Sequence, residues 1–324
     1  MTTENNPGRL NLQAELSKRP VNFGAEKWLG EVIPVLDHGF VYLVDYMGND
    51  EAIEQAARVS YGSGTRKASE TRGLIRYLLR HRHTTPFEMV ELKFHAKMPI
   101  FVARQWVRHR TASINEYSGR YSILDNEFYV PEPEVIALQS TSNRQGRGET
   151  VPNEYAEKVR QLIIADALTA YDHYGQMLND DGTGKSRNPD QPMIARELAR
   201  MGLSLNFYTQ WYWKCDLHNI FHFLGLRMDP HAQLEIRKYA EAMGRIVKDV
   251  VPIAWEAFKD YELYSIRLSR LEKELLLGLL GQKGILFTER EVLSYAENVG
   301  LVNKRERQEA LDKLRKLGVV GSEK

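Results

Sequence analysis

The stretch RHRTASINEYSGRYS, residues 108–122, gathers most of the side chains in this sequence that are suited to chemistry. It holds three arginines, one histidine, one glutamate, one asparagine and three serines. A core helix or strand is not built this way, because buried charges must be paired and buried polar groups hydrogen-bonded. Arginine forks and hydroxyls bind phosphate, and a carboxylate or amide pairs with the edge of a uracil-like ring. The lack of lysine also favours planar, bidentate contacts. The stretch therefore predicts a site for small anionic ligands.

Two histidines and one cysteine offer other kinds of site. His218 and His222 are four residues apart on a predicted helix and share a face. A metalloprotease helix needs glutamate after its first histidine, and Asn219 stands there instead, so we favour packed or ligand-facing histidines and expect no metal. Cys215 is the only cysteine and follows an aromatic run, which favours a small buried residue over a catalytic nucleophile.

A nucleic-acid-binding protein is the alternative function that the sequence leaves open. The arginine-rich stretch 104–120, with its neighbouring aromatic residues, would carry that binding. The formal net charge of the whole chain is only +1, however, and gives no reason to expect nucleic acid or an anionic membrane as the main partner. We therefore expect no nucleic-acid or membrane partner.

Composition and length are those of an ordinary globular protein. The chain has 324 residues, of which 43% are apolar and 27% charged. No run of about eighteen apolar residues is present, and the amino terminus lacks the apolar middle of a secretion signal. A single cysteine excludes an intramolecular disulfide, which fits a reducing cytoplasm.

The elements that must position the stretch 108–122 follow from periodicity and capping residues. Val90, Leu92, Phe94, Ala96 and Met98 alternate with polar residues, as in a half-buried strand. Pro99 follows and predicts a helix over 99–110, so the polar stretch leaves from a helix end. Further strands are predicted at 39–48 and 203–213, and further helices at 51–60, 69–82, 153–178 and 192–201.

The second half of the chain reads as helical after its last strand. Asp216 is expected to cap a helix over 217–228. Gly202 is expected to end the helix over 192–201 in a left-handed conformation. Two more helices start near 231 and 252, and three short ones follow residue 265, the second with a Thr288–Glu291 capping box. This organisation predicts a polar N-terminal extension (1–31), an α+β catalytic domain (32–264) and a helical C-terminal extension of unknown role (265–324).

Residues 108–121 resemble the signature R-H-R-x(2)-S-x-N-E-x-S-x-R-Y of flavin-dependent thymidylate synthases, and every fixed position is met. Other segments resemble that family in the same order: HTTPFE, PIFVARQW, EFYVP, NFYTQWYW and FLGLRMDPHAQLEIR. The resemblance covers residues 32 to 264. It implies a thymidylate synthase-complementing-protein-like fold, in which a mixed sheet is combined with long helices.

The resemblance also implies an activity and an assembly. It implies a homotetramer that binds FAD between subunits and reductively methylates dUMP to dTMP. The carbon would come from 5,10-methylenetetrahydrofolate and the hydride from NADPH. Because FAD, dUMP and folate are all anions, a site for them must be locally cationic, as the stretch 108–122 is.

Individual roles follow from the resemblance by position. Arg227 is implied to lie against the uracil ring and to stabilise negative charge as N3 loses its proton, and His83 to lie near the flavin. The residues implied for FAD are Thr85, Arg108, His109, Arg110, Glu116, Asp216, His218 and His222. The residues implied for dUMP are Gln105, Trp106, Val107, Arg108, Glu116, Tyr117, Ser118, Gly119, Arg120, Arg200 and Arg227.

Overall fold

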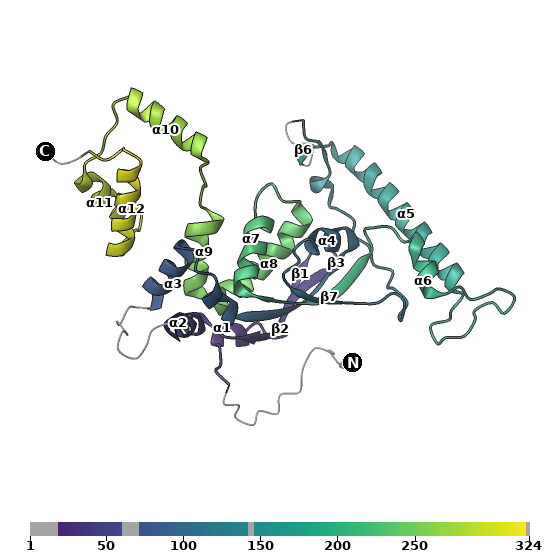
Figure 1. Ribbon diagram of the computed structural model, residues 1–324. Helices are drawn as coiled ribbons and strands as arrows, with labels where there is room; N and C mark the ends of the chain where they lie inside the picture. The colour runs from purple at the N-terminus through teal and green to yellow at the C-terminus, as the bar shows by residue number, and fades with distance from the viewer. Residues whose placement is uncertain (1–18, 60–70, 142–145, 322–324) are drawn as a thin grey trace. The chain divides into compact units, whose positions relative to one another are not determined.

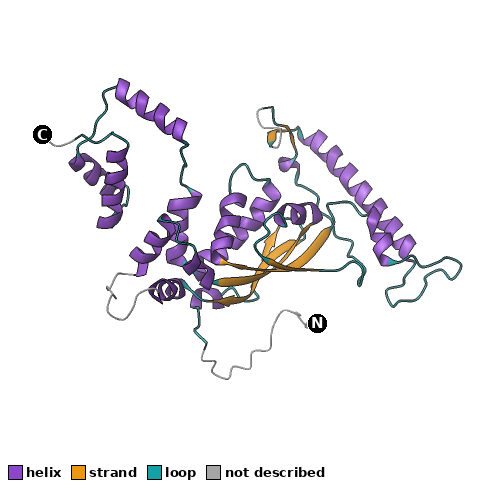
Figure 2. Cartoon of the chain, in the orientation of Figure 1, coloured by secondary structure: helices purple, strands orange, loops and turns teal. Residues whose placement is uncertain are grey.

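The computed structural model describes residues 19–59, 71–141 and 146–321. The chain divides into two compact units, residues 1–263 and 264–324, which are described here one at a time. Figures 1 and 2 show a sheet flanked by helices in the first unit and helices alone, apart from one isolated β-bridge, in the second. The fold is α+β, as predicted.

An antiparallel five-stranded sheet with the order β1-β2-β3-β7-β4 forms the centre of the first unit. The central strand β3 alternates between buried and half-buried residues, which confirms the strand that the alternation at 90–98 predicts. Its neighbours in the sheet come from distant parts of the sequence. The strands are β1 (Ile33–Val35), β2 (Gly39–Met47), β3 (Glu91–Pro99), β4 (Ser113–Glu116) and β7 (Tyr208–Asp216).

Helices cover this sheet and enclose an aromatic core. Helices α4, α7 and α8 pack on it, and α8 also contacts α9. Trp106, Trp213, Phe223 and Tyr239 are all fully buried in this core. The helices are α1 (Phe23–Glu26), α2 (Asp50–Val59), α3 (Thr71–Arg80), α4 (Ile100–Trp106), α7 (Leu217–Arg227), α8 (Leu234–Val250) and α9 (Pro252–Phe258), with the short helices η1 (Thr85–Met89) and η4 (Lys259–Leu263).

Two predicted helix ends differ from the structure. Helix α4 ends at Trp106, not near residue 110, because the amides of Arg108 and His109 bond to carbonyls three residues back and tighten the chain into turns. The segment 192–202 forms only α6 (Arg196–Ala199) and η3 (Arg200–Gly202), and Gly202 is not left-handed. The cap predicted at Asp216 is confirmed: its carboxylate accepts from the amide of Asn219 at 3.0 Å.

The helix α5 (Asn153–Leu178) has the bounds that the sequence predicts. It extends away from the sheet with α6, η3, η2 (Pro133–Val135) and the hairpin of β5 (Ala137–Gln139) and β6 (Arg147–Thr150) (Figure 1). Tyr171 and Tyr174 on α5 bind both backbone groups of Leu124, at 2.9 and 3.1 Å. Helix α5 thereby holds the loop that follows residues 108–122.

Residues 22–30 belong to the folded unit, although the sequence places them in the polar extension. Asn22 caps α1 with its side-chain oxygen and donates to the carbonyl of Val250 at 2.8 Å. Trp28 donates to Asp249 at 2.8 Å, and Ala25 is fully buried. This part of the chain therefore packs against α8.

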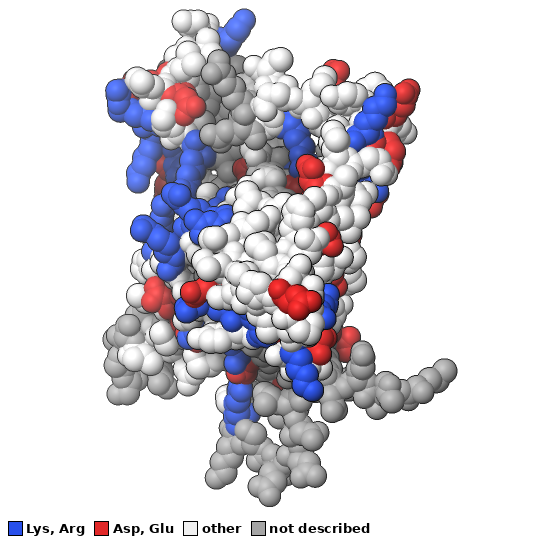
Figure 3. Space-filling view, turned by 90° about the vertical axis from the view of Figure 1, so that its right-hand side faces the viewer, with Lys and Arg blue, Asp and Glu red and all other residues white. Residues whose placement is uncertain are grey.

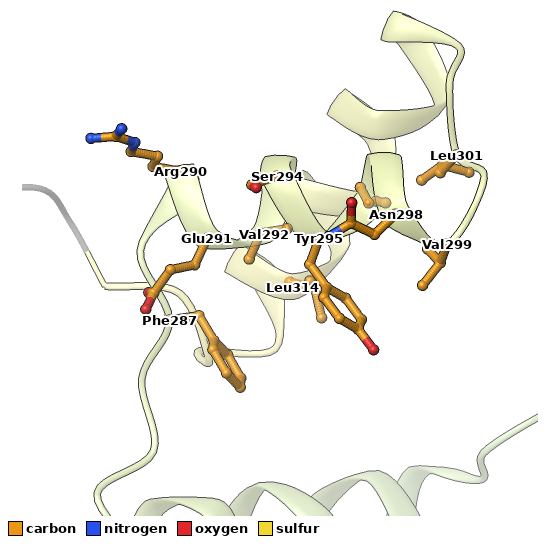
Figure 4. A pocket seen from close by; sticks show the side chains of 12 residues that line it. Phe287, Arg290, Glu291, Val292, Ser294, Tyr295, Asn298, Val299, Leu301 and Leu314 are labelled. Atoms are coloured by element: carbon orange, nitrogen blue, oxygen red, sulfur yellow. The ribbon is translucent and has the colours of Figure 1, made fainter.

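The second unit contains the three helices predicted after residue 265, namely α10 (Arg270–Gln282), α11 (Glu289–Asn298) and α12 (Lys304–Lys316). The Thr288–Glu291 capping box is confirmed. An apolar groove of about 780 Å³ lies along α11 and α12, and Phe287 and Tyr295 point their rings to the same side of it (Figure 4). Across both units, none of the described helices is long and apolar enough to cross a membrane.

Candidate active site

Arg227 lies at the last turn of α7, beside the end of α4. Its Nη2 donates to the backbone carbonyl of Gln105 at 3.2 Å. The guanidinium is half-buried, and this burial lowers the pKa of Arg227 from its ordinary value. A guanidinium has five N–H donors, and this is its single hydrogen bond among the described residues. The remaining donors are available to a ligand.

His109 is drawn into the protein under α7 and is only 7% exposed. Its ring lies 5.5 Å from that of His222, and Nε2 lies 3.1 Å from the hydroxyl of Thr111. Burial, reinforced by the nearby His222 and Arg227, lowers the pKa of His109 to about 4. The ring is therefore neutral at pH 7 and offers hydrogen bonds in place of a charge.

Arg108 and Arg110, on either side of His109, face solvent. Neither side chain has a hydrogen-bond or ion-pair partner in the described part of the chain. Figure 3 shows one face of the molecule, on which Lys and Arg side chains stand out toward the left of the view, with Asp and Glu side chains above and below them. Unpaired guanidinium groups are well suited to phosphate, because they make bidentate, charge-assisted hydrogen bonds. This part of the stretch is suited to a diphosphate or a similar anion.

Glu116 ends β4 and is held from the neighbouring strand. Its Oε1 accepts from the hydroxyl of Thr209 on β7 at 2.7 Å. Pairing with β7 extends one residue further, because the amide of Tyr117 donates to the carbonyl of Gln210 at 2.8 Å. The second carboxylate oxygen of Glu116 has no partner among the described residues and is available to a ligand.

Residues 118–122 form a tight turn that packs on η3. The carbonyl of Ser118 accepts from the amides of Tyr121 and Ser122 at 3.1 and 3.2 Å. A Cβ added at Gly119 would lie 3.3 Å from Cδ of Arg200 and 3.2 Å from the side chain of Leu124, so a larger residue would push both away. The turn thus brings Gly119 and Arg200, more than seventy residues apart, into contact.

Arg120 leaves this turn and pairs with Glu197 of α6 at 3.1 Å. Both side chains are more than half exposed, so the pair contributes little to stability. An anionic ligand can replace the carboxylate of Glu197 at small cost.

A cavity of about 630 Å³ opens between α2, α3 and η1. Its walls are mostly apolar, and His83 and Thr85 bring polar groups to it. The ring of Tyr77 lies 5.8 Å from that of His83. The cavity is lined among others by Ala56, Leu74, Tyr77, His83, Thr85 and Met89. A flat, partly apolar ligand group is suited to such walls.

The sequence profile described as thymidylate synthase complementing protein matches residues 42–253, which is most of the chain. The chain belongs to the flavin-dependent thymidylate synthase family. A relative of that name from Rickettsia bellii is 56% identical over 269 residues, which cover 82% of this chain and 92% of the relative. Another, from Ruegeria pomeroyi, is 55% identical over 269 residues, covering 83% and 86%.

A solved structure supports the same fold. The UMP/dUMP methylase PolB from Streptomyces cacaoi, bound with 5-Br UMP, superposes with a TM-score of 0.61 at 33% identity, over 72% of this chain and 99% of PolB. The chain is therefore a methyltransferase of dTMP synthesis, and its family favours the enzyme over the nucleic-acid-binding alternative.

Two of the residues predicted to bind ligands serve the fold instead. Trp106 is fully buried, with its ring 4.9 Å from that of Phe223 and its carbonyl accepting from the amide of His109, so the whole residue belongs to the core. Both carboxylate oxygens of Asp216 accept from Asn219, at 3.0 and 2.7 Å. The carboxylate of Asp216 is therefore a helix cap, and its capping role limits what it can offer to FAD.

Of the other predicted residues, His109 and Gly119 are buried, and the rest are exposed or half-buried. His218 is half-buried on the first turn of α7, His222 is exposed near His109, and Val107 is 36% exposed at the end of α4. Cys215 is 3% exposed, its thiol donates to the carbonyl of Thr111 at 3.2 Å, and burial strongly raises the pKa of that thiol. This confirms the small buried residue that the sequence favours.

The predicted residues fall into three groups that share no hydrogen bond or ion pair in the described part of the chain. One surrounds His109 and Arg227, one surrounds Glu116 and Arg200, and one lines the cavity beside Thr85. Sequence reasoning missed Thr209, which sits in an aromatic strand that reads as core. No local signal marks it, because its partner is set by strand pairing.

Proposed function

We propose that this enzyme converts dUMP to dTMP with 5,10-methylenetetrahydrofolate as carbon donor, NADPH as hydride source and FAD as its flavin. The observation that carries the proposal is the complete signature at 108–121, whose arginines 108 and 110 are exposed and unpaired in the described structure. The similar UMP/dUMP methylase PolB, whose structure contains 5-Br UMP, supports a pyrimidine nucleotide as substrate.

The residues present are suited to FAD. Arg108 and Arg110 are free for its diphosphate, and the neutral ring of His109 between them adds hydrogen bonds without competing charge. Thr85 and His83 border an apolar cavity that suits part of a flat ring system. His222 extends the first group from α7. When bound, FAD supplies the hydride-transfer chemistry of the reaction.

The substrate dUMP is proposed to lie against the turn 118–122 and the end of α4. Arg120 and Arg200 would hold its phosphate, with the backbone of the turn at Ser118 and Gly119 beside it. Glu116 and Tyr117, together with Gln105 and Val107, would orient the nucleoside. The side chains of Arg120, Arg200 and Glu116 are exposed and can reach a ligand.

Arg227 is the proposed catalytic residue. Its free N–H groups would face the edge of the uracil and stabilise the negative charge that develops as N3 loses its proton. That charge raises the electron density at C5, the carbon that receives the methyl group. A partly buried guanidinium does this well, because electrostatic stabilisation is stronger where water is excluded.

The enzyme is proposed to work as a homotetramer whose sites are shared between subunits, in the cytoplasm. What supports the sharing is that the three residue groups share no hydrogen bond or ion pair in the described part of one chain. A second subunit that brings one group to another would complete the site. The reducing setting suits the lone buried thiol, and NADPH and folate are co-substrates of cytoplasmic metabolism.

The test is an assay with purified protein in which each component is left out in turn. We expect a yellow protein that oxidises NADPH faster when dUMP is present and forms dTMP, identified by mass spectrometry. NADH in place of NADPH measures the preference for the reductant. A colourless protein that neither takes up added FAD nor makes dTMP would contradict the proposal.

A further inference from the structure

Helix α10 exposes an apolar surface that a folded protein rarely leaves to water. It has 13 residues, none of them buried, and six are leucines. Leu271, Leu275, Leu276 and Leu279 are between 43% and 65% exposed. A helix with leucines around most of its circumference is normally buried, and one of this length is marginal on its own in water. Helix α10 therefore needs a partner.

One line of side chains along α10 has the spacing of a coiled-coil seam. Glu272, Leu276, Leu279 and Lys283 follow one another at intervals of four, three and four residues, which places them on one face. Lys283 continues that face because it keeps a right-handed helical conformation. Its ammonium group has no ion-pair partner in the described residues, and Glu272 uses only Oε2, which accepts from the amide of Ser269.

We propose that α10 pairs antiparallel with α10 of a second copy of this chain. About a twofold axis between residues 277 and 278, Leu276 lies opposite the second copy's Leu279, and Glu272 lies opposite its Lys283. Leu275 and Leu280 flank the seam and also meet. Such a contact is self-complementary and closes without leading to fibres.

Charge selects this orientation over the alternative. In a parallel pair, Glu272 would face Glu272 and Lys283 would face Lys283, and both contacts would repel. In the antiparallel pair, both become opposite-charge contacts at the two ends of an apolar centre. A single pair of short helices buries less than the roughly 1,200 Å² that stable association needs. The contact therefore joins chains that are already held together, and in this respect it rests on the proposed homotetramer.

Cysteine crosslinking of the full-length chain tests the seam. The crosslinking is done in a Cys215→Ala background. In the proposed pair, the two copies of position 279 lie about 4.5 Å apart along the helix axis, from a rise of about 1.5 Å per residue. Two copies of position 271 lie about 20 Å apart by the same arithmetic. A bis-maleimide with a reach of about 10 Å, the spacing of packed helices, should join Leu279→Cys chains and leave the matched control Leu271→Cys mostly unjoined.

Charge reversal gives a second readout, and light scattering gives a third. Lys283→Glu should reduce crosslinking at position 279 several-fold, and adding Glu272→Lys should restore it. Equal crosslinking at positions 271 and 279 would overturn the seam. A tetrameric mass without crosslinking at 279 overturns the α10 contact alone, whereas a monomeric mass without crosslinking overturns both the contact and the proposed assembly.

Discussion

Thr209 donates a hydrogen bond of 2.7 Å to Glu116 and thereby fixes the carboxylate at the end of β4. Thr209 is only 7% exposed, whereas Glu116 faces solvent, so the bond connects the core to the candidate site. One carboxylate oxygen is held in this way and the other remains for a ligand. The orientation of Glu116 therefore depends on a residue that itself lies too deep to touch substrate.

Thr209→Val should weaken turnover without removing a ligand contact. Valine has nearly the same shape but no hydroxyl, so Glu116 loses its orienting bond. A hydrogen bond to a charged group contributes about 1.5 kcal/mol at the lower end, which is roughly tenfold in kcat/KM for dUMP. Thr209→Ser keeps the hydroxyl and should retain most of the activity. Equal losses in both variants would point to a packing role for Thr209.

Arg227→Ala should slow dTMP formation by roughly tenfold to over a hundredfold, since a charge-assisted hydrogen bond is worth about 1.5–3 kcal/mol. Flavin content should stay near that of the parent, because Arg227 is proposed to act on the nucleotide. Arg227→Lys keeps the charge but not the planar fork, and should recover only part of the rate. Parent-like turnover in Arg227→Ala would show that the assignment is wrong.

Cys215→Ala should keep most of its activity. A route through a thiolate would need an accessible sulfur in a cationic setting, but this thiol is buried beside Asp216 and its pKa is raised, so it stays protonated at neutral pH. The expected cost is a small packing defect of about 1 kcal/mol. Mass spectrometry after treatment with a mechanism-based fluorinated dUMP analogue should find no adduct at position 215. An adduct there, or an abolished rate in folded and flavin-loaded protein, would overturn the flavin route.

Local patterns predicted the fold where an element is set by its own periodicity. The alternation at 90–98 and the long helix at 153–178 needed no tertiary information, and both are confirmed. The end of α4 did need it, because His109 turns inward to pack under His222 and Trp213. The sequence could not show that packing.

The candidate site likewise has a part that the sequence predicts and a part that depends on tertiary packing. The signature located the arginines, the glutamate and the turn, since their types are fixed by ligand chemistry. It could not show that Trp106 is core, nor that Glu116 is held by a threonine 93 residues further along the chain. Pairing between β4 and β7 decides such contacts, and strand pairing is a long-range property.

Stability should fall between pH 7 and pH 5 because of His109. In the folded protein its pKa is about 4, below the ordinary value of 6.5, so in this range the unfolded chain takes up a proton that the folded protein does not. The contribution of neutral His109 to the free energy of unfolding is thus present above pH 6.5. It is lost as the pH falls, by about 2 kcal/mol at pH 5. Urea unfolding at pH 7 and pH 5 should show a smaller loss of unfolding free energy in His109→Gln than in the parent. Equal losses would contradict a neutral, buried His109.

Residues 265–324 should be dispensable for chemistry, whereas η4 should not. Arg76 on α3 is paired with Glu256 at 2.7 Å and with Asp260 of η4 at 2.8 Å, and the hydroxyl of Tyr261 accepts from it at 3.1 Å. Helix α3 also forms a wall of the cavity beside Thr85.

A chain ending at residue 264 keeps these contacts and should bind flavin and form dTMP within about twofold of the parent rate. A chain ending at residue 258 loses Asp260 and Tyr261 and should bind flavin more weakly, measured by flavin absorbance per mole of folded protein. Loss of flavin from a folded chain ending at 264 would show instead that the C-terminal extension completes the site.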